Sequence, residues 1–214
     1  MSTDVLNIIR DSKIIAIVRG IPSSQIVGLA NALLKGGIKC IEVTFDQSSE
    51  EKANDTLLAI GKIKASCPDV LVGAGTVMTV EQVQKASASG AEYIISPNTN
   101  KDVIEETKKL GKVSIPGALT PTEVAFAYEC GADIVKLFPA GVFGPSYIKA
   151  VKAPLKHIPV TAVGGVNVEN CKDFIAAGCI GVGVGGNLVS PKLVSEGKFD
   201  EISAIAKAYV EALH

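Results

Sequence analysis

The chain of 214 residues is poor in the side chains on which several common kinds of site depend. It contains no tryptophan and only two histidines, His157 and His214, which lie far apart in the chain. A zinc site built on imidazoles and a Ser-His-Asp triad both need histidines that come together, so we expect neither. No tract of basic residues occurs, and the 21 basic and 22 acidic residues nearly cancel, which argues against nucleic acid as a partner.

Two further absences concern redox state and location. No Cys-x-x-Cys pair exists among the five cysteines, and their number is odd, so reduced thiols are predicted rather than disulfides. The N-terminus lacks the pattern of a signal peptide, and no apolar run is long enough to span a membrane. We therefore expect a cytoplasmic protein with no membrane partner.

What the sequence has in abundance is one repeating unit. Short runs rich in β-branched residues are each followed by Gly or Pro and then by a helical stretch rich in Ala, Lys and Glu. The eight predicted strands span residues 13–18, 39–44, 70–73, 92–96, 113–116, 133–137, 159–163 and 180–184. The predicted helices lie near residues 22–35, 49–66, 79–88, 100–110, 120–130, 145–153, 167–177 and 199–213, with a further helix near 2–11.

This alternation predicts an α/β fold, a single (β/α)8 TIM barrel with an extra N-terminal helix. Strands that alternate with helices form βαβ units and a parallel sheet, and eight such units indicate closure into a barrel. No linker or break in composition divides the chain, so residues 1–214 are expected to form a single domain. The alternative is an open doubly wound sheet, but the turn Arg19-Gly20-Ile21-Pro22 after the first strand does not fit its GxGxxG pattern.

Two polar residues stand inside strands that are otherwise apolar. Lys136 lies between Val135 and Leu137, where apolar surroundings disfavour the ammonium ion and favour a free amine that can attack a ketone to form an imine. Glu42 lies in the second predicted strand, with Thr44 on the same face, and a carboxylate there would move protons during imine chemistry. We count Thr44 among the substrate-binding candidates. The alternative interpretations are an exposed lysine at a strand end, or a structural ion pair between the two residues.

Further candidates follow the ends of the strands, where barrels carry their chemistry. Arg19 ends the first strand and suits a substrate carboxylate or phosphate, although an ordinary surface arginine is an equal alternative. Gly164-Gly165 and Gly185-Gly186 end the seventh and eighth strands. Paired glycines let backbone N–H groups approach an anion closely, and barrels often bind phosphate between these two loops, so we predict a phosphate site there rather than simple tight turns.

Two other turns offer weaker candidates. Thr76 follows the third strand and is placed to contact a substrate carboxylate, and Pro97 follows the fourth strand and is placed to form a wall of the pocket. Both residues also have a plain explanation as turn formers.

Taken in order, these segments resemble the family of 2-keto-3-deoxy-6-phosphogluconate (KDPG) and 4-hydroxy-2-oxoglutarate (KHG) aldolases. The resemblance runs from the first strand to the eighth. It is carried by Ile17-Val18-Arg19-Gly20, Ile41-Glu42-Val43-Thr44, Val72-Gly73-Ala74-Gly75-Thr76-Val77, Ile95-Ser96-Pro97-Asn98, Pro116-Gly117, Thr120-Pro121-Thr122-Glu123, Val135-Lys136-Leu137-Phe138-Pro139-Ala140 and Val163-Gly164-Gly165-Val166.

The resemblance implies a class I aldolase of the barrel fold that needs no metal or other cofactor, releases pyruvate and commonly forms a homotrimer. It implies that Lys136 forms the Schiff base with a phosphorylated keto-deoxy sugar acid and that Glu42 transfers protons. The residues that it implies for substrate binding are Arg19, Thr76, Pro97 and Phe138 at the pyruvate end and Gly164, Gly165, Gly185 and Gly186 at the phosphate.

Two positions depart from the pattern of many KDPG aldolases. Asp46 stands where those members have an arginine that binds the pyruvate carboxylate, so an acid there would repel the substrate unless Arg19 or a backbone donor compensates. Asn187 stands where serine often follows the second glycine pair, and we count it among the substrate-binding candidates. The stretch from Phe138 to Lys149 is closer to the branch that acts on the 6-phosphogalactonate epimer, which also lacks that arginine.

The main prediction is therefore a Schiff-base aldolase that cleaves 2-keto-3-deoxy-6-phosphogluconate. The 6-phosphogalactonate epimer and 4-hydroxy-2-oxoglutarate remain alternative substrates. One rival is a phosphate-binding barrel isomerase or epimerase, which would use Lys136 and Glu42 as an acid/base pair without an imine. A second rival is a sugar-phosphate-binding protein without activity, which the presence of the lysine disfavours.

Overall fold

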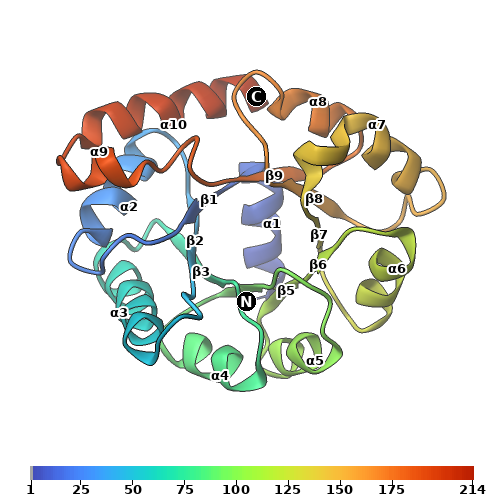
Figure 1. The fold of residues 1–214 in the computed structure, drawn as a ribbon, viewed down its shortest axis with the longest axis horizontal. Coiled ribbons are helices and arrows are strands. Elements are labelled where there is room, and N and C mark those ends of the chain that lie inside the picture. The colour runs from blue at the N-terminus through green and yellow to red at the C-terminus, as the bar shows by residue number, and fades with distance from the viewer. Residues whose placement is uncertain (1) are drawn as a thin grey trace.

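The computed structural model describes residues 2–214, with side chains from Asp4 onward, and shows parallel strands in a ring surrounded by helices (Figure 1). The strands are β1 Ile14–Val18, β2 Cys40–Thr44, β3 Leu71–Gly75, β4 Tyr93–Ile95, β5 Val113–Ile115, β6 Gly117–Ala118, β7 Val135–Leu137, β8 Val160–Val163 and β9 Gly181–Val184. The helices are α1 Ser2–Ser12, α2 Ile26–Lys35, α3 Glu50–Ser66, α4 Val80–Ala88, α5 Lys101–Lys109, α6 Pro121–Glu129, α7 Ala140–Lys152, α8 Cys171–Ala176, α9 Pro191–Ser195 and α10 Phe199–Leu213.

The ring closes through the fifth strand of the barrel. All pairings are parallel, in the order β5-β4-β3-β2-β1-β9-β8-β7-β6, and only Pro116 separates β5 from β6. Proline has no N–H to donate and interrupts the ladder, so one continuous strand is divided into a part that pairs with β4 and a part that pairs with β7. The nine segments therefore make eight barrel strands, and the predicted (β/α)8 barrel is confirmed.

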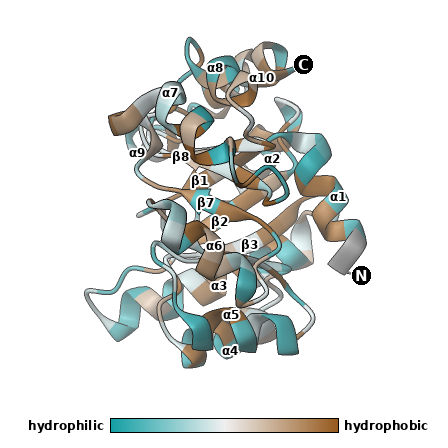
Figure 2. Cartoon of the chain, turned by 90° about the vertical axis from the view of Figure 1, so that its right-hand side faces the viewer, coloured by the Kyte–Doolittle hydropathy of each residue, from teal (hydrophilic) through white to brown (hydrophobic). Residues whose placement is uncertain are grey.

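Two apolar layers stabilise the barrel. The larger one lies between the outer faces of the strands and the helices, because strands covered on both sides are apolar throughout. The smaller one fills the ring and includes Ile15, Leu71, Tyr93 and Ile134. Ile9 of α1 packs against this inner layer, so the extra N-terminal helix closes the bottom of the barrel, and Figure 2 shows α1 at that end of the molecule.

Most helix boundaries agree with the sequence prediction. Thr120 and Glu123 form the capping box that their spacing indicates, and α6 begins at Pro121. The helix predicted near 145–153 is longer, because α7 begins at Ala140 and continues past a break at Gly144, whose φ is 75°. The helix predicted near 167–177 begins only at Cys171, and the short α9 was not predicted.

Two structural findings concern the expectations about location. All five cysteines are free, and all but Cys130 are buried. Within residues 2–214, no helix combines the length and the apolar character that a membrane span requires.

Candidate functional site

Lys136 lies inside the barrel, as the sequence predicts. It is the central residue of β7 and only 6% of its surface is exposed. Its Nζ lies 5.1 Å from the centroid of the Phe138 ring, and no carboxylate of residues 4–214 comes within 4 Å to form an ion pair with it. The ion pair with Glu42, which was the alternative interpretation, is therefore absent among the described residues, and the amine is held by apolar packing and an aromatic face.

Glu42 lies inside the same barrel on β2, with 2% of its surface exposed. Its carboxylate occupies the space that a side chain on Gly75 would fill, since a Cβ built there would lie 1.8 Å from Glu42 Oε1. Gly73, Ala74 and Gly75 belong to β3 and not to a turn after it, and the second of the two glycines is required by the carboxylate on the neighbouring strand. The sequence pattern singled out this segment but gave no reason for it.

Gly75→Ala is expected to displace the Glu42 carboxylate. The added methyl group overpacks a closed interior, so we expect the free energy of unfolding to fall by about 1–3 kcal/mol and kcat by about 100-fold. Thermal unfolding and steady-state kinetics measure the two effects. Gly61→Ala is the matched control, because nothing lies closer than 3.7 Å to its new Cβ. A Gly75→Ala variant as active as the control would contradict the packing argument.

A third interior residue, Tyr93, fills the space beside Gly73, the first of these two glycines of β3. A Cβ on Gly73 would lie 2.2 Å from the Tyr93 ring. The tyrosine is fully buried, which raises its pKa well above the usual value, and the nearby Cys40 and Glu42 add to the shift. Among the described residues, its hydroxyl is the one buried side-chain oxygen or nitrogen without a hydrogen-bond partner.

Tyr93→Phe is expected to leave the fold intact and to raise the free energy of unfolding by about 1 kcal/mol. The reason is that burial of the hydroxyl removes its hydrogen bonds to water, and no hydrogen bond within the protein replaces them. Chemical denaturation measures the effect. Tyr209→Phe is the comparison at a second buried tyrosine. A loss of stability of 1 kcal/mol or more in Tyr93→Phe alone would show that the hydroxyl has a partner, such as an ordered water.

The electrostatics connect Glu42 with both candidate cations. Burial raises the pKa of the Glu42 carboxyl above its usual value, and the nearby charges of Lys136 and, to a smaller extent, Arg19 oppose this rise. The three residues come from β2, β7 and the end of β1, and the structure brings them into one electrostatic group. A buried carboxyl whose pKa is raised beside a buried amine is the arrangement expected at a site of proton transfer.

The two glycine pairs lie together beside this group and line a cavity of about 390 Å³. Seven of the residues predicted from the sequence line it: Arg19, Phe138, Gly164, Gly165, Gly185, Gly186 and Asn187. The structure therefore brings the loops after the last two strands together, as predicted. Residues that the sequence reasoning missed complete the lining: Ile17, Val163, Val166, Gly183, Val189 and Pro191.

Contacts between loops hold the shape of this cavity. Gly164 and Gly165 have φ values of 89° and 75°, which favour glycine. The Gly141 backbone N–H donates to the Gly164 carbonyl oxygen at 2.7 Å, and a Cβ on Gly141 would lie 2.7 Å from that oxygen. Asn187 Nδ2 donates to the Val166 carbonyl oxygen at 2.9 Å and so joins the two glycine loops. Gly141 is thus a structural residue of the site that sequence reasoning missed.

Three predicted substrate-binding residues do not line this cavity. Thr44 Oγ1 donates to the Val18 carbonyl oxygen at 3.2 Å and lines a separate cavity of about 290 Å³. Thr76 has a φ of 55°, and its carbonyl oxygen accepts a hydrogen bond from Gln47. Pro97 packs by its carbonyl group against Gly117. The roles of Thr44, Thr76 and Pro97 in substrate binding stay predictions.

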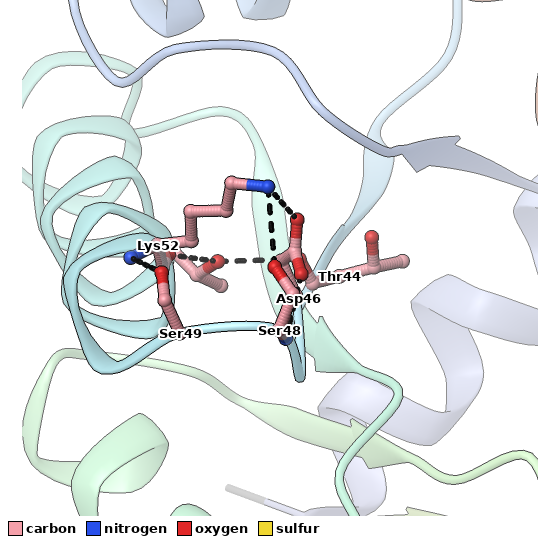
Figure 3. A network of polar contacts seen from close by, with 6 residues as sticks. Thr44, Asp46, Ser48, Ser49 and Lys52 are labelled. Atoms are coloured by element: carbon pink, nitrogen blue, oxygen red, sulfur yellow. Dashed lines mark hydrogen bonds and ion pairs between the residues drawn. The ribbon is translucent and has the colours of Figure 1, made fainter.

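Asp46, the residue that departs from the family pattern, takes part in a local network of hydrogen bonds and an ion pair (Figure 3). Its carboxylate accepts a hydrogen bond from the Ser48 backbone at 2.8 Å and forms an ion pair with Lys52 Nζ at 3.0 Å. The hydrogen bonds from Ser48, and then the contact with Lys52, lower the pKa of Asp46 to about 2. The backbone donor that was expected to compensate the acid is thus present as the Ser48 N–H, and Lys52 adds a compensation that was not expected.

Lys52→Met is expected to raise KM for an anionic substrate by about two- to fivefold at low ionic strength, because it leaves the charge of Asp46 uncompensated near the strand ends. The effect should disappear in the double variant Asp46→Asn with Lys52→Met and at high salt. Steady-state kinetics at two salt concentrations measure it. An increase that persists in the double variant would show that Lys52 acts otherwise than through Asp46.

No metal centre is evident in the described part of the chain, where no three His, Cys, Asp or Glu side chains gather closely enough to hold an ion. The polar groups of the site are an amine, a carboxyl, a guanidinium and the turns rich in glycine. These groups suit covalent and proton-transfer chemistry on an anionic substrate.

Comparison with known proteins agrees with this geometry. The family model for KDPG and KHG aldolases matches residues 5–205. The chain belongs to that family. The 2-dehydro-3-deoxy-6-phosphogalactonate aldolase of Escherichia coli K12 is 37% identical over 94% of this chain and 96% of its own length. The 2-dehydro-3-deoxy-phosphogluconate aldolase of Treponema pallidum is 35% identical over 85% of this chain and 84% of its own.

Solved structures of aldolases share the fold. A native KDPGal structure superposes with a TM-score of 0.82 at 35% identity and covers 93% of each chain. The KDPG aldolase of Legionella pneumophila, with pyruvate captured as a covalent carbinolamine intermediate, gives a TM-score of 0.86 at 25% identity over 96% of this chain and 97% of its own. The aldolase described here is thus a lyase of the barrel fold in a family whose chemistry includes a covalent adduct with pyruvate.

Proposed function

We propose that this aldolase cleaves 2-keto-3-deoxy-6-phosphogluconate to pyruvate and glyceraldehyde 3-phosphate through a Schiff base on Lys136. The observation that carries the proposal is the buried amine of Lys136, in the same interior as the Glu42 carboxyl and next to a cavity with two glycine turns. The buried carboxyl supports proton transfer, and the glycine turns support binding of a phosphate group. No cofactor enters this scheme.

The reaction begins with attack of the Lys136 amine on the C2 ketone of the substrate. Glu42 carries protons while the carbinolamine loses water to form a protonated imine. The imine accepts the electron pair of the C3–C4 bond as that bond breaks and the C4 hydroxyl loses its proton, which releases the aldehyde. The enamine that remains is protonated at C3, and hydrolysis of the imine releases pyruvate and restores the amine.

The cavity residues position the substrate in this scheme. The backbone N–H groups of the Gly164-Gly165 and Gly185-Gly186 turns bind the phosphate, and Asn187 holds the two turns together. Arg19 binds the carboxylate end, with its charge close enough to affect Glu42. Phe138, beside Lys136, packs against the pyruvate part, and Thr76 and Pro97 complete that end.

The 6-phosphogalactonate epimer is the second candidate substrate. Its support is the 37% identity with the E. coli enzyme named for that epimer, together with Asp46 at the position of the expected arginine. The values of kcat/KM for the two C4 epimers and for 4-hydroxy-2-oxoglutarate, measured with purified enzyme, separate the three possibilities. A preference of tenfold or more for the galactonate epimer would replace the main proposal.

The test of the covalent mechanism is reduction with sodium borohydride in the presence of pyruvate, followed by intact mass analysis and peptide mapping. We expect one reduced pyruvate adduct per chain, on Lys136. Reduction without pyruvate is the control. The absence of an adduct on folded protein would refute the Schiff base and favour an isomerase that uses Lys136 and Glu42 as an acid/base pair.

We also propose that the aldolase works as a homotrimer in the cytoplasm. Four large apolar side chains are exposed on the neighbouring helices α6 and α7: Phe126, Tyr128, Val142 and Phe143. A protein cage designed by fusing symmetric oligomeric domains contains a chain that is 35% identical to this one over 93% of this chain and 71% of the cage chain. Free cysteines fit a reducing compartment. Light scattering of the purified protein tests the trimer, and a monomeric mass would exclude it.

A further inference from the structure

A second cavity lies at the opposite end of the barrel from the glycine turns. It has a volume of about 550 Å³, and its lining includes Pro159 and Ile180, which immediately precede β8 and β9. The glycine pairs follow the other ends of these same two strands. We call it the basal cavity, and it is lined by Arg10, Lys149, Lys152, Ala153, Lys156, His157, Pro159, Ala176, Ala177, Gly178 and Ile180.

The basal cavity is positively charged and lacks counter-charges. Arg10, Lys149 and Lys156 line it, and none of the lining residues among residues 4–214 is acidic. Ten other lysines of the chain form ion pairs with carboxylates, but these three cations have no carboxylate of residues 4–214 within 4 Å. Cations that converge on one concave surface without partners favour the binding of an anion.

Lys152 has a different role and explains the shape of the cavity. Its Nζ donates to the carbonyl oxygens of Leu155, Lys156 and Ile158 and so fixes the loop that follows α7. His157 in that loop is held by an edge-to-face contact with the Tyr128 ring, with a centroid separation of 5.6 Å. Of the three cations, Lys156 therefore lies in a loop that Lys152 holds in place, whereas Arg10 and Lys149 belong to α1 and α7. The amine of Lys152 is itself taken up by these carbonyl groups.

The basal cavity also has apolar lining residues, which we call its floor. Ala153, Ala176 and Ala177, at the carboxyl ends of α7 and α8, meet Pro159 and Ile180 there. A volume of about 550 Å³ lies within the range of roughly 300–1,000 Å³ that is usual for sites of small molecules. An apolar floor with a cationic rim matches a molecule that has a flat apolar body and anionic groups at one end.

We propose that the basal cavity is a second binding site, for a small organic anion that carries phosphate groups on an apolar ring system, as a nucleotide does. The phosphates contact Arg10, Lys149 and Lys156, and the ring lies on the alanine floor. Because the cavity lies at the end of the barrel away from the glycine turns, its ligand and the aldolase substrate bind at the same time.

The test is isothermal titration calorimetry of the whole enzyme with ATP, tripolyphosphate and adenosine, without magnesium. We expect ATP to bind more tightly than tripolyphosphate, which lacks the ring, and adenosine, which lacks the charge. The double variant Lys149→Glu with Lys156→Glu should weaken ATP binding by about tenfold or more. Lys39→Glu with Lys112→Glu, the same charge change at two lysines outside the cavity, is the control and should bind within twofold of the parent.

Aldolase kinetics separate the basal cavity from the substrate site. ATP bound in the basal cavity should leave KM unchanged, whereas ATP bound among the glycine turns would raise KM as a competitive inhibitor. Competitive inhibition alone, or ATP binding unchanged by Lys149→Glu with Lys156→Glu, would overturn the proposal. The neutral pair Lys149→Gln with Lys156→Gln must weaken binding in the same direction. Tripolyphosphate binding as tight as that of ATP would refute the apolar floor as part of the site.

Discussion

Lys136→Met is expected to abolish turnover while the barrel stays folded. Methionine fills nearly the same volume but cannot form an imine, so kcat/KM should fall by about four orders of magnitude or more, as when an enzyme loses its nucleophile. Lys136 has no carboxylate of residues 4–214 within 4 Å, so its removal breaks no ion pair, and Glu42 loses only a nearby charge that lowers its pKa. We expect the melting temperature to stay the same or rise, because a buried polar group is replaced by an apolar side chain of similar volume.

Steady-state kinetics and thermal unfolding of the same preparation measure both effects. Lys207→Met, the same change at an exposed lysine on α10, is the control and should keep full activity. Turnover above about one percent of the parent in Lys136→Met would show that another group carries the covalent step. Loss of activity together with unfolding would instead show that the amine has a structural role.

The fold could be predicted because each strand and most helices have a local sequence pattern that indicates them. All eight strands lie where β-branched runs predict them, and the capping box at Thr120 marks the start of α6. The details that were missed depend on tertiary context. The division of one strand at Pro116 follows from its two neighbours, because the part before the proline pairs with β4 and the part after it pairs with β7. The helical turn before Gly144 is counted with α7 because the chain continues as a helix after the break at Gly144.

The candidate site could be predicted in part. Lys136, Glu42 and the glycine pairs were recognisable because polar or flexible residues are unexpected inside or after apolar strands. Contacts between distant segments could not be predicted. Gly75 is required by Glu42 on another strand, and Lys52 on α3 offsets Asp46 at the end of β2. Neither relation leaves a periodic pattern in the sequence.

Glu42→Gln is expected to lower kcat by about 10²- to 10⁴-fold, the usual contribution of a positioned proton-transfer group. The amide fills the space beside Gly75 but cannot carry a proton between imine and solvent. Binding of substrate should change little, so KM should stay within a few-fold of the parent. Glu211→Gln, at an exposed position on α10, is the control for the chemical change.

The same variant tests the electrostatics of Glu42 through the pH dependence of stability. Burial raises the pKa of this carboxyl in the folded state above the value of 4.5 expected for an unfolded chain, so folding favours the protonated form. The parent therefore loses stability as the pH rises through the raised pKa, and glutamine, which does not ionise, escapes this loss. The gain in melting temperature of Glu42→Gln over the parent should be smallest below pH 4.5 and grow toward neutral pH. A gain that is independent of pH would show that Lys136 and Arg19 outweigh burial and keep Glu42 ionised at its ordinary pKa.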